Sequence, residues 1–571
     1  ADPNSSGRQM PQHYGHKELN IVSQSSPTGT QYLQAVGAAF GIQKDNSSAV
    51  VYVSSGDGTT SQGDFHEALN WASREKAPVI FHVENNGYAI SVPLAEQTSG
   101  ESIYNITSGY EHLDRYSIDG TSYFESVLAF NKAIDRARKG KGPTVIESKV
   151  VRLLPHSSSD DHRKYRTDEE IDEEKLKDPI IIFKNTCIDK KIIKKEEFDK
   201  INVEIKKQVD KDAEWAELQE DPNPINSMIN IYSDKNNSFD TPKNVGDKIV
   251  LVDAINHALE EELIFNKKML VYGQDIAGGK GGVFTATRGL TDKFGKNRVF
   301  NSPLAESSII GTAIGFSTLG YKPVIEIQFG DYIWTSMMQI RNEVATMRYR
   351  SNGDWTCPIV MRVPVGGYIH GSLCHSQSIE GYFTHLPGIK IAFPSNASDA
   401  KGLLKAACRM DDPVLFLEHK GLYRQGFATS DEPDSEYLLE FGQANIVQSG
   451  TDITIVTWGA LVQKSIEAAK KTNISVEIID LRTLNPLDFD TILQSIKKTN
   501  RLIVVHEDNL TNGFGAEIVS KISDVGFEFL DAPIKRVATK DSPIPYSQVL
   551  EDQILVQIDW IVDSINELGQ Y

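Results

Sequence analysis

The sequence is poor in cysteine and contains no long apolar run. Its 571 residues include only four cysteines, Cys187, Cys357, Cys374 and Cys408, which are far apart and form no CxxC pair. A disulfide scaffold or a cysteine-rich zinc site is therefore not expected, and the cysteines fit a reducing compartment such as the cytoplasm. No run of about 18 apolar residues and no signal-peptide core occur, so no transmembrane helix is expected.

Positive charge is also scarce. Lys and Arg total 59 against 78 for Asp and Glu, which gives a formal charge of −19. Such an acidic chain is not expected to bind nucleic acid or anionic membranes non-specifically. The rest of the composition, 40% hydrophobic and 24% charged, is typical of a globular protein and excludes collagen-like or fully disordered chains. At about 150 residues per domain, the length predicts three or four domains.

Short apolar runs alternate with helical patterns, which predicts an α/β fold. Residues 49–54 and 78–83 are expected to be buried parallel strands, with a helix over 64–76 between them. The same alternation recurs in two later blocks, where helices are expected over 251–265 and 335–349. We predict open, mostly parallel sheets covered by helices, which bind ligands beyond the carboxyl ends of their strands.

One stretch between these blocks differs in character. Residues 168–174 are acidic and 189–200 carry mixed charge, while spaced apolar residues permit exposed amphipathic helices. A polar, turn-rich stretch over 233–247 is the expected domain boundary. Residues 171–245 are therefore predicted to form a charged helical linker.

Two polar motifs follow the two strands predicted in the first block. GDG stands at residues 56–58, after the first strand, and NNGY at residues 85–88, after the second. A carboxylate, an amide oxygen and a backbone carbonyl can converge there on one cation, and hard oxygen ligands suit Mg²⁺. The glycines allow the backbone to approach a phosphate closely. A lone GDG is most often a turn, but the pair at this spacing indicates a metal and diphosphate site.

This pair resembles the thiamine-diphosphate signature, in which GDG is followed by NN. Six further stretches resemble the decarboxylating component of branched-chain 2-oxo acid dehydrogenases. The first three resemble its α subunit and the last three resemble its β subunit. They are GRQMPQHYG (7–15), SSPTGTQYLQAVG (25–37) and HSSSDDHRKYR (156–166), followed by NSPLAE (301–306), IEIQFGDY (325–332) and HSQSIE (375–380).

The resemblance implies an α/β fold class with three open, mostly parallel-sheet domains. Two are copies of the thiamine-diphosphate-binding fold and the third is like the transketolase C-terminal domain. The expected divisions are an α-type diphosphate-binding domain (1–170) without the family's N-terminal part, a charged helical linker (171–245), a β-type pyrimidine-binding domain (246–430) and a transketolase C-terminal-like domain (431–571).

The cofactors implied by the resemblance are thiamine diphosphate and Mg²⁺. Asp57, Asn86 and the carbonyl of Tyr88 match the Mg²⁺ ligands. At position 84 the sequence has Glu, whereas the mitochondrial relatives have Arg beside the diphosphate. The charge of the diphosphate must therefore be neutralised by Mg²⁺ and other groups. Further residues match positions that line the cofactor: Ser26, Thr28, Gly56, Gly58, Leu304, Glu306, Gln328 and Tyr332.

A second cation site is implied near the start of the chain. Ser25, Pro27, Thr30 and Gln31 match a structural K⁺ site of the family, whose hydroxyl and carbonyl oxygens suit a hard cation. An ordinary helix N-cap formed by Ser25 or Ser26 is also open and is compatible with such a site.

Three residues match catalytic positions. Glu306 matches the glutamate that faces the pyrimidine ring of the cofactor, and burial among apolar neighbours would raise its pKa; the alternative is a helix-start residue that caps backbone N–H groups. His375 matches the active-site histidine of the β subunit, which can donate a proton, or else it is a structural histidine. His156 matches an α-subunit loop histidine near the diphosphate and substrate, or else it is a solvated loop residue.

The implied function is oxidative decarboxylation of branched-chain 2-oxo acids, with reductive acylation of a lipoyl group. The implied partner is the lipoyl acyltransferase component, and the family's α₂β₂ assembly implies a homodimer of the fused chain. Three alternatives stay open. They are a pyruvate dehydrogenase component, another thiamine enzyme of the transketolase type and a non-catalytic, cofactor-free relative.

Overall fold

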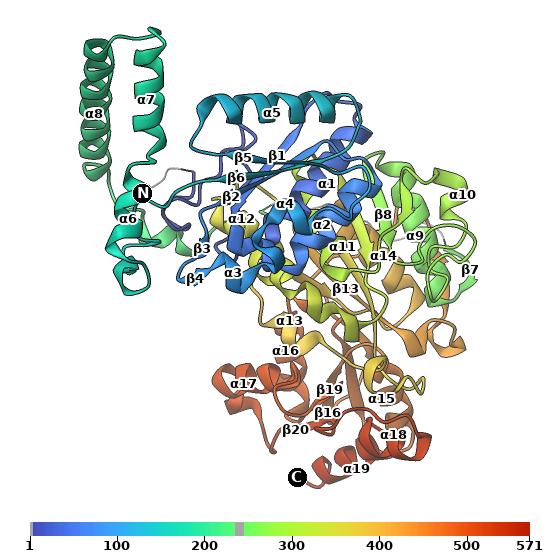
Figure 1. Cartoon of the computed structure of the whole chain (residues 1–571). Coiled ribbons are helices and arrows are strands. Elements are labelled where there is room, and N and C mark those ends of the chain that lie inside the picture. Colours follow the sequence, from blue (N-terminus) through green and yellow to red (C-terminus); the bar gives the residue numbers. More distant parts are fainter. Residues whose placement is uncertain (1–3, 235–244) are drawn as a thin grey trace. The chain divides into compact units, whose positions relative to one another are not determined.

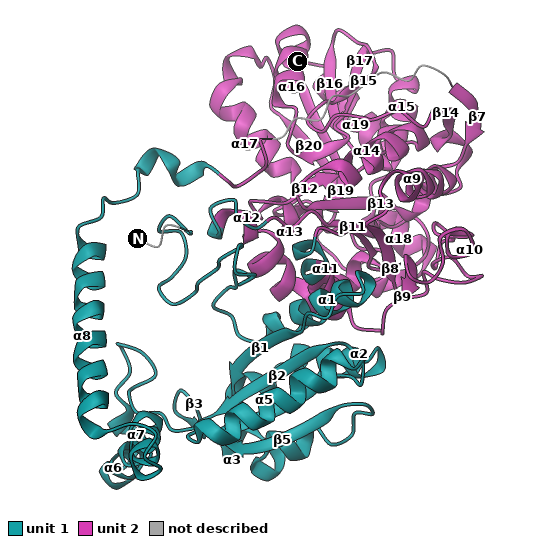
Figure 2. Ribbon diagram, turned by 90° about the horizontal axis from the view of Figure 1, so that it is seen from above, with its two compact units in different colours: residues 1–229, 314–319, 350–355 teal, residues 230–313, 320–349, 356–571 magenta. Residues whose placement is uncertain are grey.

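The computed structural model describes residues 4–234 and 245–571 (Figure 1). The chain divides into two compact units, shown in different colours in Figure 2. Unit 1 contains residues 1–229, 314–319 and 350–355, and unit 2 contains residues 230–313, 320–349 and 356–571. Among the described residues, no helix is both long and apolar enough to cross a membrane.

Unit 1 contains a four-stranded parallel sheet. Its order is β1 (Val51–Gly56), β2 (Val79–Asn85), β6 (Thr144–Lys149) and β5 (Asp114–Asp119). The main covering helices are α1 (Thr30–Lys44), α2 (Gly63–Arg74) and α5 (Tyr123–Arg138).

Alternate residues of β2 face opposite sides of this sheet. Phe81 is fully buried beside Tyr32 of α1, with the ring centroids 6.0 Å apart. Its neighbour Ile80 belongs to the cluster formed with Ala129 and Ala133 of α5. The β1–α2–β2 order confirms the strand–helix–strand unit predicted from the sequence.

The predicted linker is helical. Three helices, α6 (Asp168–Lys175), α7 (Pro179–Asp189) and α8 (Lys195–Glu217), belong to unit 1, and α8 has no buried residue. Figure 1 shows α7 and α8 side by side, and Lys184 of α7 pairs with Asp199 of α8 at 2.9 Å. Exposed helices are therefore confirmed here, whereas most of the boundary expected over 233–247 lies outside the described residues.

Unit 2 contains a larger sheet of seven strands, all parallel except for one antiparallel edge strand, β18. Its order is β18 (Thr483–Asn485), β12 (Lys390–Ala392), β13 (Val414–His419), β11 (Val360–Val365), β10 (Lys322–Glu326), β8 (Met269–Gly273) and β9 (Val299–Asn301). Neighbouring helices are α9 (Leu251–Phe265), α11 (Glu306–Thr318), α13 (Glu380–Thr384) and α14 (Ala397–Arg409).

The helix predicted over 251–265 is confirmed by α9, but the one predicted over 335–349 differs. That stretch contains the end of the 3₁₀ helix η5 (Gly330–Ser336), the π-helical η6 (Met338–Val344) and the start of α12 (Met347–Arg350). The fully buried polar side chains of Gln339 and Glu343 lie in η6.

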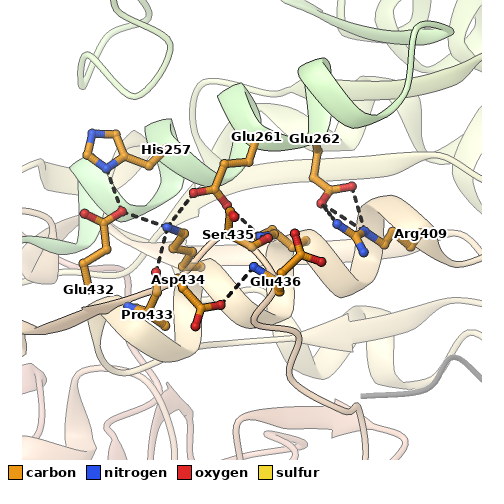
Figure 3. A network of polar contacts seen from close by, with 11 residues as sticks. His257, Glu261, Glu262, Arg409, Glu432, Pro433, Asp434, Ser435 and Glu436 are labelled. Carbon is orange, nitrogen blue, oxygen red and sulfur yellow. Dashed lines mark hydrogen bonds and ion pairs between the residues drawn. The ribbon is translucent and has the colours of Figure 1, made fainter. Parts of the chain in front are cut away.

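An ion-pair network links α9 to α14 and to the segment after β14 (Ser430–Pro433) (Figure 3). Lys401 and Lys405 are buried, and both contact Glu261, at 2.7 and 2.6 Å. Arg409 contacts Glu262 at 2.7 Å. Because these buried charges are paired, the network explains why α14 tolerates lysines in its interior.

The last part of unit 2 forms a second sheet of five strands. Its order is β15 (Asn445–Gln448), β17 (Val476–Asp480), β16 (Ile453–Thr457), β19 (Leu502–Asn509) and β20 (Lys535–Thr539), parallel except for β15. Its helices are α15 (Leu461–Lys470), α16 (Phe489–Thr499), α17 (Gly515–Val525), α18 (Gln548–Ile554) and α19 (Ile558–Leu568). The three mostly parallel sheets confirm the predicted α/β fold class.

Candidate functional site

The polar motifs of unit 1 lie at the carboxyl edge of its sheet. Asp57 follows β1, Asn86 follows β2 and Arg152 follows β6, and these three parallel strands are neighbours. Because the carboxyl ends of parallel strands meet at one edge, three separate segments of sequence come together there.

Asp57 is the most buried of these residues, with 1% of its surface exposed. Its Oδ1 accepts a hydrogen bond from the backbone N–H of Asn86 at 3.3 Å. Its Oδ2 is buried and has no hydrogen-bond partner among the described residues. Burial raises the pKa of Asp57, while nearby backbone N–H groups and Arg152 oppose the rise. A buried carboxylate oxygen without a partner is chemically suited to a cation.

The loop after β2 supplies the other two predicted ligands. The Oδ1 of Asn86 accepts from the backbone N–H of Tyr88 at 3.0 Å, which closes the turn. Tyr88 pairs in the short β3–β4 ladder with Pro93, which has no N–H to donate to the Tyr88 carbonyl. A Cβ on Gly58 would lie 2.4 Å from the Cβ of Ala89, so this glycine is required where the two loops approach. The donor set fits Mg²⁺.

His156 is connected to this edge through side chains of unit 1. Its backbone N–H donates to Asp160 Oδ2 at 2.9 Å, and the Tyr165 hydroxyl donates to the same oxygen at 2.6 Å. Arg152 donates to the Tyr165 hydroxyl at 2.8 Å and lies 5.4 Å from the centroid of the Tyr88 ring. The His156 side chain itself is exposed, so its loop is anchored while its imidazole is accessible.

Arg152 was not predicted from the sequence as a site residue. Its charge favours the ionised form of Asp57, and no motif marks it, because its role depends on contacts with distant residues. Glu84, which the resemblance marked as a departure, has a half-exposed side chain, 53%, and lies 3.8 Å from His82. Arg152 therefore places a positive charge near Asp57.

The predicted K⁺ residues cluster where α1 begins. The Thr30 hydroxyl donates to the Pro27 carbonyl at 3.5 Å, and Gln31 Oε1 accepts from the Gly29 N–H at 2.9 Å. Gly29 is the N-cap and makes no side-chain cap hydrogen bond, so the alternative N-cap by Ser25 or Ser26 is wrong. Two of the predicted cofactor-lining residues, Ser26 and Thr28, are exposed, and the Ser26 hydroxyl contacts Met10 Sδ at 3.3 Å.

The predicted residues of unit 2 also follow parallel strands of one sheet, in which β10 and β11 are neighbours and β8 lies between β10 and β9. Glu306 comes after β9, Gln328 and Tyr332 after β10, and His375 after β11. The second sheet edge therefore gathers the segments that carry the predicted catalytic side chains of this unit.

Glu306 is the first residue of α11. Its Oε1 accepts from Gln274 Nε2 at 3.1 Å, and Gln328 donates to Asp275 at 2.8 Å. The expected burial of Glu306 is incomplete, because it is half-buried within the described residues. Leu304 beside it is 85% exposed. Glu306 and Leu304 are therefore both accessible at the start of α11.

His375 is held by two aromatic residues. Its Nε2 and the Tyr332 hydroxyl form a hydrogen bond of 2.6 Å, and its ring meets Phe329 edge-on, with the centroids 4.7 Å apart at 89°. Burial raises the pKa of Tyr332. Tyr332 also lines a cavity of about 810 Å³, which contains Asp331, Cys374 and residues of the last sheet. The Tyr332 side chain of this pair is therefore accessible to a small molecule in the cavity.

Comparisons with known proteins match all three parts of the chain. Family models match for the dehydrogenase E1 component over residues 1–225, the transketolase pyrimidine-binding domain over 247–425 and the transketolase C-terminal domain over 442–561.

Two curated relatives come from Bacillus subtilis. The chain is 44% identical over 324 residues to the 2-oxoisovalerate dehydrogenase subunit beta, covering 56% of this chain and 98% of that protein. It is 45% identical over 304 residues to the pyruvate dehydrogenase E1 component subunit beta, covering 53% and 93%. A solved split-gene transketolase, an inactive beta4 tetramer, gives a TM-score of 0.45 at 22% identity, covering 56% of this chain and 98% of that one.

Proposed function

The chain belongs to the thiamine-diphosphate-dependent family of 2-oxo acid dehydrogenase E1 components, with α-like and β-like parts in one polypeptide, and from this premise we propose that it oxidatively decarboxylates branched-chain 2-oxo acids. We propose that the resulting acyl group is transferred to the lipoyl group of an acyltransferase component, which gives an acyl-dihydrolipoyl group. The observation that carries the proposal is Asp57, whose buried, unpartnered carboxylate oxygen (among the described residues) lies beside Asn86.

Two sequence stretches support the branched-chain substrate. GRQMP at residues 7–11 and HSQS at residues 375–378 resemble the branched-chain enzymes more than the pyruvate enzymes. Overall identity does not separate the two, because 44% and 45% are nearly equal. The pyruvate dehydrogenase component is therefore the second candidate function.

Each unit has its own proposed task. Asp57, Asn86 and the Tyr88 carbonyl hold Mg²⁺, and Arg152 adds positive charge for a diphosphate. Thiamine diphosphate, when bound, supplies the carbanion that adds to the 2-oxo group and the electron sink for loss of carbon dioxide. Glu306 would face a ring nitrogen of the aminopyrimidine and share a proton with it. His375, fixed by Tyr332, donates a proton to or orients the substrate, and His156 does so from the loop of unit 1.

The proposed assembly is a homodimer that works with the lipoyl acyltransferase in the cytoplasm. Cys187 and Cys408 are free and buried, which fits a reducing compartment. The proposed K⁺ ligands Ser25, Pro27, Thr30 and Gln31 would brace the start of α1, since Thr30 and Gln31 are its first two residues.

Carbon dioxide release from 2-oxoisovalerate, 2-oxoisocaproate and pyruvate, measured side by side, tests the function. The assay contains thiamine diphosphate, Mg²⁺ and an artificial electron acceptor, so the acyltransferase is not needed. We expect kcat/KM for the two branched acids to exceed that for pyruvate by about tenfold or more, since each buried methylene contributes to discrimination. Equal or better use of pyruvate would favour the second candidate. No release from any acid, together with no calorimetric binding of thiamine diphosphate, would refute both.

A further inference from the structure

A buried lysine lies behind the candidate catalytic histidine and has no assigned role. Lys420 directly follows β13, the strand next to β11, and only 5% of its surface is exposed. Its Nζ has no hydrogen-bond partner among the described residues. It lies 5.5 Å from the centroid of Phe329, the ring that meets His375 edge-on. An unpaired ammonium in such a place is costly to bury unless its charge is used.

Two acidic residues act on this ammonium electrostatically, and only one of them has an oxygen without a hydrogen-bond partner among the described residues. Asp331 and Glu507 both favour the charged form of Lys420. Glu507 is already engaged, because its two oxygens contact the Gly367 N–H and His419 Nε2, each at 2.6 Å. Asp331 keeps a buried Oδ1 without a hydrogen-bond partner among the described residues. The charge of Lys420 is therefore most directly available to Asp331.

Asp331 in turn contacts the loop that carries His375. Its Oδ2 accepts from the backbone N–H of Gln377, two residues after His375, at 3.4 Å. Gly330 fixes the start of the segment, because a Cβ there would lie 2.9 Å from Val365. Asp331 is followed by Tyr332, whose hydroxyl bonds His375. The carboxylate thus contacts the histidine loop on one side and the tyrosine segment on the other.

We propose, resting on the proposed function, that Lys420 is a positioning residue: its ammonium keeps Asp331 ionised, and ionised Asp331 fixes the loop that presents His375 to the substrate. The charges around the pair agree with this arrangement. Burial raises the pKa of Asp331, and Lys420 is the strongest group opposing the rise, followed by the Gln377 N–H; His375 also opposes it. Burial lowers the pKa of Lys420 to about 8, so it still carries its charge at neutral pH.

The variant Lys420→Met tests the proposal, because it removes the charge but keeps an apolar stem. Lys420→Arg keeps the charge. Lys322→Met is the matched control, since Lys322 is equally buried but donates to the Met410 carbonyl, away from Asp331. The whole chain is used, with thermal unfolding recorded for each variant to verify folding.

The first readout does not depend on activity. Hydrogen exchange of the peptide covering 371–380 should be faster in Lys420→Met and in Asp331→Asn, and unchanged in Lys420→Arg and Lys322→Met. Unchanged exchange in Lys420→Met, with the fold intact, would overturn the proposal. Should Lys420→Met fail to fold, Asp331→Asn with normal exchange would overturn it instead.

The second readout is turnover. We expect kcat to fall by about 10- to 100-fold in Lys420→Met while KM stays within about twofold, because small misplacement of a reacting group lowers the rate that strongly. The acid limb of the kcat profile should shift to higher pH, since Asp331 loses its neighbouring cation. The double variant with Asp331→Asn should be no slower than Asp331→Asn alone; additive losses would contradict the proposal. An inactive wild type with the predicted exchange pattern would refute only the proposed function.

Discussion

The two units prepare their candidate site residues in different ways. In unit 1, Asp57 keeps a buried oxygen without a partner among the described residues. In unit 2, the two candidate catalytic side chains are already hydrogen-bonded, Glu306 to Gln274 and His375 to Tyr332. An open oxygen is available to a cation, whereas a hydrogen-bonded side chain is held in a fixed orientation. From this difference we propose that unit 1 determines metal and diphosphate affinity and that unit 2 determines turnover.

The largest effect is expected from the variant Glu306→Gln, which tests the role of unit 2 in turnover. The amide cannot hold the proton that a carboxylate shares with a ring nitrogen, so kcat should fall by at least about 1000-fold, within the range found for general acid–base groups. The exposed Glu528→Gln serves as a control in a 2-oxoisovalerate decarboxylation assay. Turnover in Glu306→Gln within tenfold of the wild type would contradict the assignment.

The pH dependence of metal binding probes unit 1. Burial raises the pKa of Asp57, so protons compete with Mg²⁺ at a higher pH than they would at an ordinary aspartate. Below that pKa, the apparent Kd for Mg²⁺ in the presence of thiamine diphosphate should rise by about tenfold per pH unit at most.

A fluorescence titration with Mg²⁺ between pH 7.5 and 5 measures this dependence. Asp57→Asn should weaken binding and flatten the profile, whereas Asp135→Asn, an exposed carboxylate on α5, should leave it unchanged. A wild-type profile that is flat over this range would contradict the predicted role of Asp57.

The sequence predicted elements and motifs whose signals are local. The helix over 251–265 follows from apolar periodicity, and GDG and NNGY are recognisable because they directly follow strands. Arg152 and Lys420 were missed, because a single charged residue has no pattern of its own. The role assigned to each depends on a residue that the fold brings near it: Tyr165 for Arg152 and Asp331 for Lys420.

A smaller effect is expected from Tyr332→Phe. The change removes the hydroxyl that bonds His375 and keeps the ring, so kcat should fall by about three- to tenfold, the worth of one hydrogen bond. Steady-state kinetics with 2-oxoisovalerate measures it. Tyr382→Phe, an exposed tyrosine of the same unit, is the control, and equal losses in both variants would argue against a role for the Tyr332–His375 pair.

The smallest effect concerns stability in unit 2. Glu380 is fully buried, and burial together with Asp508 raises its pKa from 4.5 to about 8. The folded chain therefore binds a proton that the unfolded chain has released, so stability falls as pH rises through this window. The wild type should therefore lose Tm between pH 6 and pH 8, and Glu380→Gln should lose less. We expect the two losses to differ by about 2 °C or more. Trp458, which donates to Glu380 Oε1, can still donate to the amide oxygen of the variant. Differential scanning calorimetry measures the Tm values. A difference in Tm between variant and wild type that is the same at pH 6 and at pH 8 would contradict the prediction.

Calorimetric titration of thiamine diphosphate in Mg²⁺ tests most directly whether the two units divide affinity and turnover. The account predicts that Asp57→Asn raises the Kd by about 100-fold, as expected for loss of a charged ligand. It predicts that Glu306→Gln, although inactive, raises the Kd by less than about tenfold. An unchanged Kd in Asp57→Asn, or an equal loss of affinity in both variants, would contradict it.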